Sequence, residues 1–286
     1  MSSMLKKLLL FSACCIFWTL TAFAQQPTAQ VVYKVVGPDT LKLHVFTPAV
    51  DTAGAPRPAI VFFFGGGWVS GNPKQFYPHA AYFASRGMLA IAAEYRIKNL
   101  HNTTPYESVA DAKSAIRWVR MHADSLHVDP DKIVAAGGSA GGHIAATTGV
   151  INGHEDGADN LSISSRPAAM ILFNPVLDLS PVKWHDRFNG QDPLSISPIH
   201  QLDAAHPPTL VFHGTADKTV PFSQARSFCT AMSHTGSTCR LMQFDGMDHG
   251  FFNRGRLGNK PYVATVRAAD EFLIELGILT GTPTIK

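Results

Sequence analysis

Residues 133–143 read IVAAGGSAGGH, a Gly-x-Ser-x-Gly pattern between a β-rich run and an Ala-rich stretch typical of a helix. A serine on a sharp strand-to-helix turn is lifted clear of a sheet, and only glycine tolerates the backbone crowding there, at Gly137 and Gly141. The turn also puts Ser139 at a helix N-terminus, where free N–H groups and the helix dipole favour developing negative charge. The pattern predicts a nucleophilic serine.

Upstream, residues 62–68 read FFFGGGW, so a buried run ends in three glycines. Such a loop presents backbone N–H groups that no side chain covers, as an oxyanion hole requires. A phosphate-binding loop is excluded, because no Gly-Lys-Ser/Thr follows the glycines.

Downstream, two further residues follow apolar runs. Asp217 follows the run at 209–213, and His249 lies in a Gly-flanked loop after the run at 240–245. A serine hydroxyl becomes a good nucleophile when a histidine accepts its proton and a carboxylate orients that histidine. Asp248 is a rival acid, but adjacent residues rarely orient each other's rings, so Asp217 is favoured.

Around these motifs, short continuous apolar runs alternate with helical patterns, which predicts an α/β fold with a mostly parallel sheet covered on both faces.

Residues 47–58 are predicted to be a loop. The segment 178–206 has no strong period and is interpreted as a short insertion over the carboxyl edge of the sheet. A leading hairpin is predicted from Val31–Val36 and Leu41–Phe46. The buried strands are predicted at Ala59–Phe64, Met88–Tyr95, Lys132–Ala136, Ala168–Asn174, Thr209–His213 and Arg240–Asp245, and the helices at Pro78–Arg86, Tyr106–Ala123, Ala140–Val150, Ser223–Ser233 and Tyr262–Leu276.

Length and composition agree with one globular domain. The chain has 286 residues, of which 45% are hydrophobic and 16% charged. These values exclude a disordered chain, a collagen-like repeat and a coiled coil. We expect residues 25–286 to form a single domain.

The first 24 residues resemble a secretory signal peptide. Lys6 and Lys7 precede an apolar run that is too short for a confident membrane helix, and Ala22-Phe23-Ala24 supplies a small-x-small cleavage site. A lipoprotein signal ending at Cys14 is a weaker alternative. Cleavage after Ala24 leaves 22 basic and 21 acidic residues. We therefore expect an exported protein, periplasmic or secreted, with no nucleic-acid or anionic-membrane partner.

The mature chain keeps two cysteines, Cys229 and Cys239. In an oxidising compartment an even count favours a disulfide, which would close a loop of about ten residues and stabilise the fold by roughly 2–3 kcal/mol. The alternative is a pair of buried free thiols.

No metal site or cofactor is expected, because the sequence lacks His-Glu-x-x-His and Cys-x-x-Cys. The acidic segment 154–159 is interpreted as a solvated loop, with an adventitious cation as the alternative. Asp178, His213 and His143 are assigned structural roles. Trp68, Tyr95 and Trp184 are candidates to line a substrate pocket.

Together these motifs resemble the α/β-hydrolase superfamily, in its hormone-sensitive-lipase-like branch of small secreted bacterial esterases with an HGGGW-type loop. The resemblance covers about Pro58 to Phe252, and the order serine, acid, histidine is the family's. It implies Ser139 as nucleophile, His249 as base and Asp217 as its partner. It also implies an oxyanion hole formed by the N–H groups of Gly66, Gly67 and Ala140.

One position departs from the family pattern. Phe64 stands where the family has a histidine that braces the glycine loop. The departure concerns anchoring of the loop rather than proton transfer, and Phe64 can brace the loop by packing.

The resemblance and the signal-like start together imply an exported serine carboxylesterase that acts through an acyl-enzyme and needs no cofactor. The short insertion suggests an open site and a short acyl group, above all acetyl. Acylated carbohydrates are the suggested substrates, by analogy alone. Two alternatives stay open: a peptidase like prolyl oligopeptidase, and a non-catalytic binding protein on a hydrolase scaffold.

Overall fold

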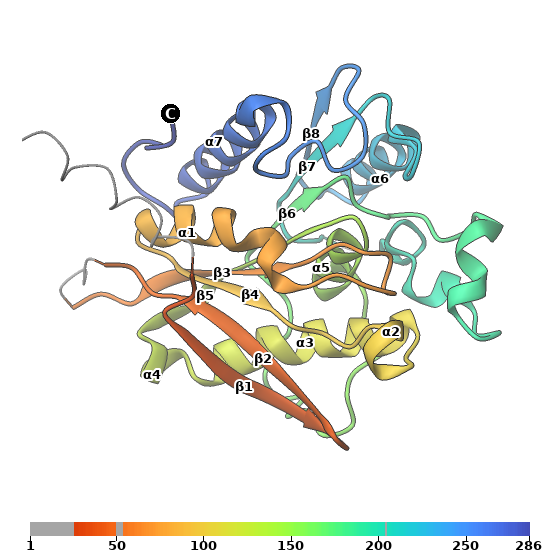
Figure 1. The fold of residues 1–286 in the computed structure, drawn as a ribbon, viewed down its shortest axis with the longest axis horizontal. Coiled ribbons are helices and arrows are strands. Elements are labelled where there is room, and N and C mark those ends of the chain that lie inside the picture. The colour runs from red at the N-terminus through yellow and green to blue at the C-terminus, as the bar shows by residue number, and fades with distance from the viewer. Residues whose placement is uncertain (1–25, 50–53, 204) are drawn as a thin grey trace, which may run out of the picture.

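The computed structural model describes residues 26–49, 54–203 and 205–286. The expected signal peptide, residues 1–24, and the alternative lipid site at Cys14 lie outside the described residues. In the described part, one eight-stranded sheet has the order β1-β2-β4-β3-β5-β6-β7-β8. Figure 1 shows helices packed along this sheet. The predicted α/β class is confirmed.

The strands are short and most of them are buried. In chain order they are β1 (Ala29–Val36), β2 (Asp39–Phe46), β3 (Arg57–Phe63), β4 (Leu89–Ala93), β5 (Val128–Gly138), β6 (Ala169–Phe173), β7 (Thr209–Gly214) and β8 (Cys239–Phe244).

The helices of the described residues include several single turns. The α-helices are α1 (Tyr77–Ser85), α2 (Lys98–His101), α3 (Pro105–Met121), α4 (Ala123–Leu126), α5 (Ala140–Val150), α6 (Phe222–His234) and α7 (Lys260–Glu275). The 3-10 helices are η2 (Pro73–Phe76), η3 (Val182–Arg187), η4 (Pro193–Ile196), η5 (Pro198–Gln201) and η6 (Leu257–Asn259).

The sheet has an antiparallel start and a parallel body. β1 pairs with β2, and β2 with β4, in antiparallel fashion, whereas all pairs from β4 to β8 are parallel. The predicted hairpin is confirmed, with its turn at Gly37-Pro38. The loop predicted for 47–58 ends earlier than expected, because the N–H of Arg57 donates to the carbonyl of His127 at 3.0 Å and extends β3.

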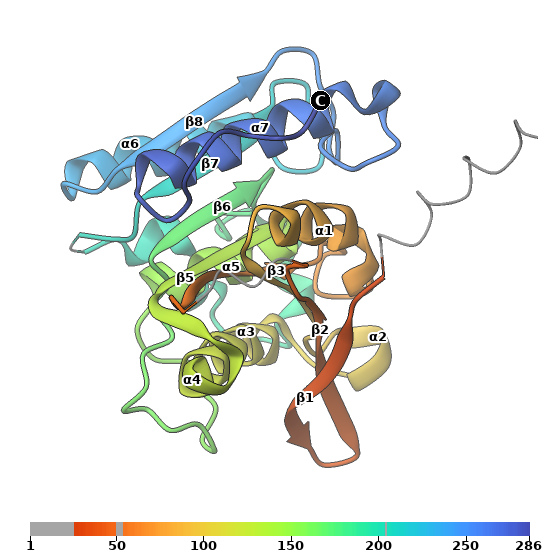
Figure 2. The ribbon, with the colours of Figure 1, turned by 90° about the vertical axis from the view of Figure 1, so that its left-hand side faces the viewer.

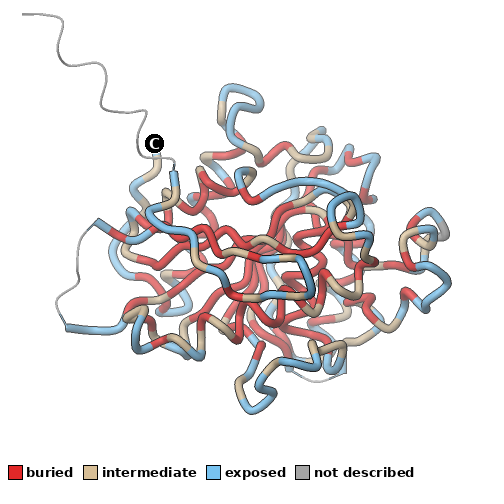
Figure 3. Tube along the Cα trace, turned by 60° about the horizontal axis from the view of Figure 1, so that its bottom comes forward, coloured by how far each residue is buried: buried red, intermediate tan, exposed pale blue. Residues whose placement is uncertain are grey.

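Helices lie on both faces of the sheet. In Figure 2, α1 and α7 lie on one face and α3 and α5 on the other. β3, β4, β6 and β7 are therefore apolar and buried almost throughout. Figure 3 shows the buried residues gathered through the middle of the molecule and the exposed ones in the peripheral loops. In the described ranges, none of the helices combines the length and apolar character that a membrane crossing requires.

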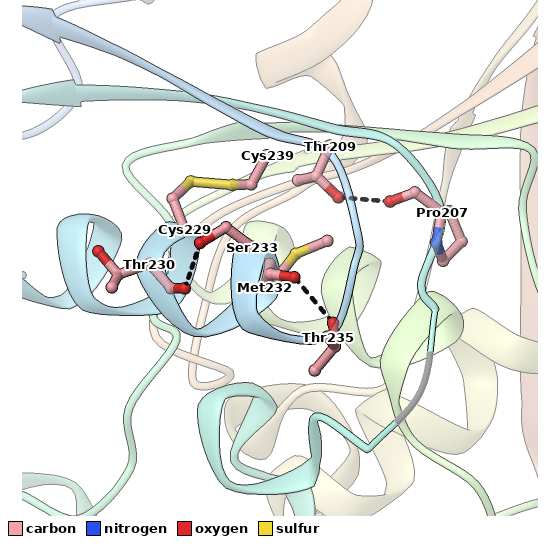
Figure 4. Close-up of a disulfide and its surroundings, with 8 residues drawn as sticks. All are labelled: Pro207, Thr209, Cys229, Thr230, Met232, Ser233, Thr235 and Cys239. Carbon is pink, nitrogen blue, oxygen red and sulfur yellow. Dashed lines mark hydrogen bonds between the residues drawn. A yellow bond between two sulfur atoms is a disulfide. The ribbon is translucent and has the colours of Figure 1, made fainter.

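A projecting segment lies at the carboxyl edge of the sheet, and a disulfide lies at the opposite, amino end of the edge strand. Residues 178–203, blue-green at the right of Figure 1, form η3, η4 and η5 and project from the body of the fold. A disulfide joins Cys229 of α6 to Cys239 at the start of β8, with the Cα atoms 5.1 Å apart (Figure 4). The bond ties an outer helix to the edge strand on which it packs.

Candidate active site

Ser139 lies on the turn between β5 and α5, in a strained backbone conformation with φ 56° and ψ −120°. The turn is crowded by backbone. A Cβ on Gly137 would lie 2.3 Å from the carbonyl oxygen of Gly141, and a Cβ on Gly141 would lie 2.1 Å from that of Phe63. Neither position accommodates a side chain, as the Gly-x-Ser-x-Gly pattern predicts.

Ser139, His249 and Asp217 form one chain of hydrogen bonds. The Oγ atom of Ser139 lies 3.0 Å from Nε2 of His249, and Nδ1 of the same ring lies 2.7 Å from Oδ2 of Asp217. The three residues come from the ends of β5, β7 and β8, which adjoin one edge because the strands run parallel. With a proton on Nδ1 bonded to the carboxylate, Nε2 can accept the hydroxyl proton of Ser139.

Asp217 is held in its ionised form. Burial opposes ionisation, but hydrogen bonds from His213 and His249 and from the N–H of Val220 outweigh it, so the pKa of Asp217 lies well below its usual value. Its Oδ1 accepts from the N–H groups of Thr219 and Val220, each at 2.9 Å. The carboxylate therefore stays available to orient and stabilise a charged His249 ring.

The other candidate acids lie elsewhere. Asp248 is exposed and forms an ion pair with Arg256 at 2.9 Å. Asp178 accepts the N–H of Ser180 at 2.9 Å, the local turn that the sequence suggests. His213 donates to the carbonyl of Val220 at 2.9 Å and lies 3.4 Å from Asp217, so its role is to support the acid.

The glycine loop adjoins the serine. A Cβ on Gly65 would lie 3.3 Å from Cβ of Ser139, and Gly66 and Gly67 have φ values of 131° and 64°. All three glycines line the same cavity as Ser139. Ala140 is the first residue of α5, and the first N–H groups of a helix have no acceptor within the helix. The residues named for an oxyanion hole therefore surround the serine.

Phe64 braces this loop by packing. Its ring stacks on that of Tyr95 with centroids 4.2 Å apart, and the Tyr95 hydroxyl donates to the Phe64 carbonyl at 2.7 Å. The expectation that Tyr95 lines the substrate cavity is wrong: its side chain is 1% exposed and lies behind the loop. The ring and the hydroxyl of Tyr95 support the backbone of the glycine loop instead.

A cavity of about 660 Å³ opens over Ser139, within the usual range for small-ligand sites. Trp68 and Trp184, two of the pocket candidates, do line it, with ring centroids 6.0 Å apart and the planes nearly perpendicular. The remaining lining is mainly small or polar and comprises Gly65, Gly66, Gly67, Gly71, Asn72, Gln75, Ser139, Asn174, Val176, Arg187, Thr219, His249, Gly250, Phe252 and Asn253.

His143 fixes Trp68 from behind. Burial lowers the pKa of His143 to about 4, so the ring is neutral at pH 7. Its Nδ1 accepts the indole N–H of Trp68 at 3.2 Å, and its Nε2 donates to the carbonyl of Ile196 at 2.7 Å. The structural role predicted for His143 is confirmed, and it links the glycine loop to the segment 178–206.

Sequence reasoning missed a bridge between the glycine loop and the histidine loop. Oε1 of Gln75 accepts the N–H of Gly65 at 2.7 Å, and its Nε2 donates to Oδ1 of Asn253 at 3.1 Å. Nδ2 of Asn253 then donates to the Gly250 carbonyl at 2.9 Å. Neither amide belongs to a motif, so no local pattern marks the bridge.

Asn174 was also missed as a site residue. It follows β6, is fully buried, and has an unusual φ of 36°. Its Nδ2 lies 3.4 Å from Nε2 of His249, and its Oδ1 accepts the N–H of Gly250 at 3.3 Å. Its place at the carboxyl end of a buried strand was the available signal.

The acidic segment 154–159 differs from the expectation of a solvated loop. Glu155 forms ion pairs with Lys113 at 2.9 Å and with Arg117 at 2.6 Å, and both cations are buried. Asp156 likewise pairs with Lys34 at 2.6 Å. The carboxylates of this segment therefore neutralise the positive charges of lysine and arginine side chains inside the fold. Within the described ranges, no group of three or more His, Cys, Asp or Glu side chains is arranged to hold a metal ion.

Comparison with known proteins identifies solved structures and sequences that are similar to this chain. The structure of Thermogutta terrifontis esterase 2 phosphoramylated by tabun is 51% identical in sequence, with a TM-score of 0.85, over 89% of this chain and 96% of that one. Further structures of that esterase hold propionate and butyrate.

Curated relatives are more distant and longer. A probable carboxylic ester hydrolase, LipM of Mycobacterium tuberculosis, is 29% identical over 80% of this chain and 56% of its own length. An acetylxylan esterase of Xylanibacter ruminicola is 26% identical over 68% of this chain and 41% of its own length. This chain thus spans about half the length of these relatives.

The family comparison agrees with the fold and with the resemblance noted from the sequence. The BD-FAE family model matches residues 43–191 and 189–232, which is more than half of the chain and includes Ser139 and Asp217. This chain belongs to the BD-FAE family and has the fold of the α/β-hydrolase esterases.

Proposed function

We propose that this protein is a serine carboxylesterase that hydrolyses short-chain esters through an acyl-enzyme intermediate. The observation that carries the proposal is the hydrogen-bonded chain from Ser139 through His249 to Asp217, which opens into a cavity lined by Gly65, Gly66 and Gly67. Nucleophile, base, orienting acid and backbone donors then meet in one place.

In the first half-reaction, Oγ of Ser139 attacks the ester carbonyl carbon while its proton passes to Nε2 of His249. The carbonyl oxygen becomes an oxyanion, to which the N–H groups of Gly66, Gly67 and Ala140 donate. Collapse of this intermediate breaks the bond to the alcohol, which leaves with the proton from His249. Asp217 stabilises the imidazolium throughout.

In the second half-reaction, water attacks the acyl carbon and gives its proton to His249. The tetrahedral intermediate collapses, the bond to Oγ breaks, and the proton returns to Ser139. The products are one carboxylic acid and the free enzyme.

The residues that line the cavity support a short acyl group. The rings of Trp68 and Trp184 and the Arg187 guanidinium all border it, and the segment 178–206 contributes only short 3-10 helices near it. The propionate and butyrate held by the Thermogutta terrifontis esterase agree with this size. We therefore place acetyl to butyryl esters first among substrates.

We further propose export, cleavage after about Ala24, a mature single domain of residues 25–286, and an acylated carbohydrate as the physiological substrate. The signal-like residues 1–24 and the Cys229–Cys239 disulfide support export. The similarity to an acetylxylan esterase supports a carbohydrate, by analogy.

The test is hydrolysis of para-nitrophenyl acetate, butyrate and octanoate by residues 25–286, with Ser139→Ala as the paired variant. We expect kcat/KM to fall with chain length and activity to be lost in the variant. Release of acetate from acetylated xylan tests the carbohydrate part separately. If the unaltered protein and the variant were equally inert on every ester, the binding-scaffold interpretation would replace this proposal.

A further inference from the structure

Arg187, the last residue of η3, borders the cavity beside the glycine loop. Its Nη1 donates to the carbonyl oxygen of Gly67 at 2.8 Å. Its guanidinium carbon lies 5.6 Å from the ring centroid of Trp68 and 5.0 Å from that of Trp184. One nitrogen and the two aromatic rings therefore hold the group in place.

The charge of Arg187 has no carboxylate partner. Among the described residues, no Asp or Glu oxygen lies within 4.0 Å of its guanidinium, whereas Arg86, Arg96 and Arg117, which are also at least partly buried, each have a carboxylate partner. Burial lowers the pKa of Arg187, and the exposed neighbour Asp186 offsets this only in part. A half-buried cation without a counter-ion gains from any anion that enters the cavity.

The other residues that line the cavity carry no negative charge that would repel a bound anion. Of the residues that line the cavity, Arg187 is the permanently charged one and His249 the other ionisable one, and no carboxylate is among them. Lys183 also faces the Trp184 ring, at 4.7 Å, but its side chain is exposed, its Nζ donates to the Thr219 carbonyl, and it is not part of the lining.

We propose that Arg187 is a specificity-determining residue that selects esters bearing a carboxylate close to the scissile bond. Nε and Nη2 take no part in the Gly67 contact, and the guanidinium edge that they form matches the two oxygens of a carboxylate. Because Arg187 and Ser139 line the same cavity, a carboxylate at Arg187 and an ester carbonyl at Ser139 can belong to one small substrate. This selection rests on the proposed esterase function.

The experiment compares acids with their neutral amides of the same shape. For a carboxylate in the acyl half, monoethyl glutarate is compared with ethyl glutaramate. For one in the alcohol half, O-butyrylglycolate is compared with O-butyrylglycolamide. In at least one pair, we expect kcat/KM for the acid to exceed that for the amide by about tenfold or more, the usual effect of one charged hydrogen-bonded pair.

The variants assign the preference to one residue. Arg187→Met is expected to bring the acid-to-amide ratio to about one, and Arg187→Lys to keep part of it, because lysine is a point charge without the fork. Lys183→Met, which removes a nearby charge outside the lining, is expected to keep the ratio. Each ratio compares two substrates on one preparation, so partial unfolding of a variant cancels.

Two results would overturn the selection: no preference for the acid in either pair, or a preference that persists in Arg187→Met. Both leave the esterase function intact, provided that para-nitrophenyl acetate is hydrolysed. If no ester at all were hydrolysed, the esterase function itself would be overturned and the selection with it.

Discussion

Phe64 and Tyr95 stack ring on ring, with centroids 4.2 Å apart and planes inclined by 21°, where β3 passes into the glycine loop. The Tyr95 hydroxyl also donates to the Phe64 carbonyl at 2.7 Å. Two contacts thus fix the backbone that leads to Gly65, at the position where the sequence departs from the HGGGW-type pattern.

Phe64→Ala should lose both stability and catalysis. Removing a buried ring costs about 3–5 kcal/mol, and the loop that follows loses its support. We expect a lower urea midpoint together with a lower kcat/KM per folded molecule. Phe83→Ala is the matched control, since Phe83 is equally buried in α1 and does not line the cavity. It should lose stability alone, and an equal fall in kcat/KM for the two variants would contradict the bracing role.

Gln75→Leu should slow turnover while changing stability little. The substitution breaks the bridge from Gly65 to Asn253, so the donors beside Ser139 and the loop of His249 move independently. Small misplacements of catalytic groups cost on the order of 10- to 100-fold in rate. Steady-state kinetics on para-nitrophenyl acetate measure the loss. Gln243→Leu, at an exposed amide on β8, is the control and should retain full activity.

Asp217→Asn should reduce kcat by about a thousandfold to ten-thousandfold, because an amide favours the wrong tautomer of the His249 ring. Asp248→Asn should have almost no effect, since Asp248 is exposed and paired with Arg256. The two variants differ from the parent by the same chemical change, so kcat for each decides which acid serves the histidine. A large loss in Asp248→Asn would reverse the assignment.

His79 should make the protein sensitive to acid. Its ring is fully buried in α1, and among the described residues neither ring nitrogen has a hydrogen-bond partner. Burial lowers the pKa of His79 to about 3. The folded protein thus keeps this ring neutral, while the unfolded chain takes up a proton below its ordinary value near 6.5. Stability is complete above that value and falls as the pH drops towards 3.

Between pH 6.5 and 4.5 this linkage costs roughly 2–3 kcal/mol for His79 alone. His79→Leu should be neutral or stabilising at pH 7, because no hydrogen bond is lost, and it should flatten the acid side of the curve. His143, whose pKa burial lowers to about 4, leaves part of the slope in place. Urea unfolding at both pH values measures the change, and the exposed His234→Leu is the control. An unchanged slope in His79→Leu would show that other groups govern acid stability.

The sequence by itself determined the architecture and the strand-to-helix turn that carries Ser139. Buried parallel strands must be continuous apolar runs, so β3, β6 and β7 could be recognised within one or two residues. The turn at Ser139 demands glycine on both sides, which is a local requirement and is therefore visible in a local pattern. Each of Ser139, Asp217 and His249 follows an apolar run, which sufficed to place them at one edge, because parallel strands end together.

The tertiary structure alone decided which distant side chains meet. Gln75 and Asn253 touch across 178 residues, and Arg187 reaches Gly67 across 120. No periodicity or spacing marks such pairs, because folding rather than chain neighbourhood brings them together. The roles predicted for Tyr95 and Glu155 were wrong for the same reason. Tyr95 is covered by the glycine loop that it supports, and Glu155 forms an ion pair with the buried Lys113 of α3. An isolated polar or aromatic residue takes its role from the groups packed around it, and those come from elsewhere in the chain.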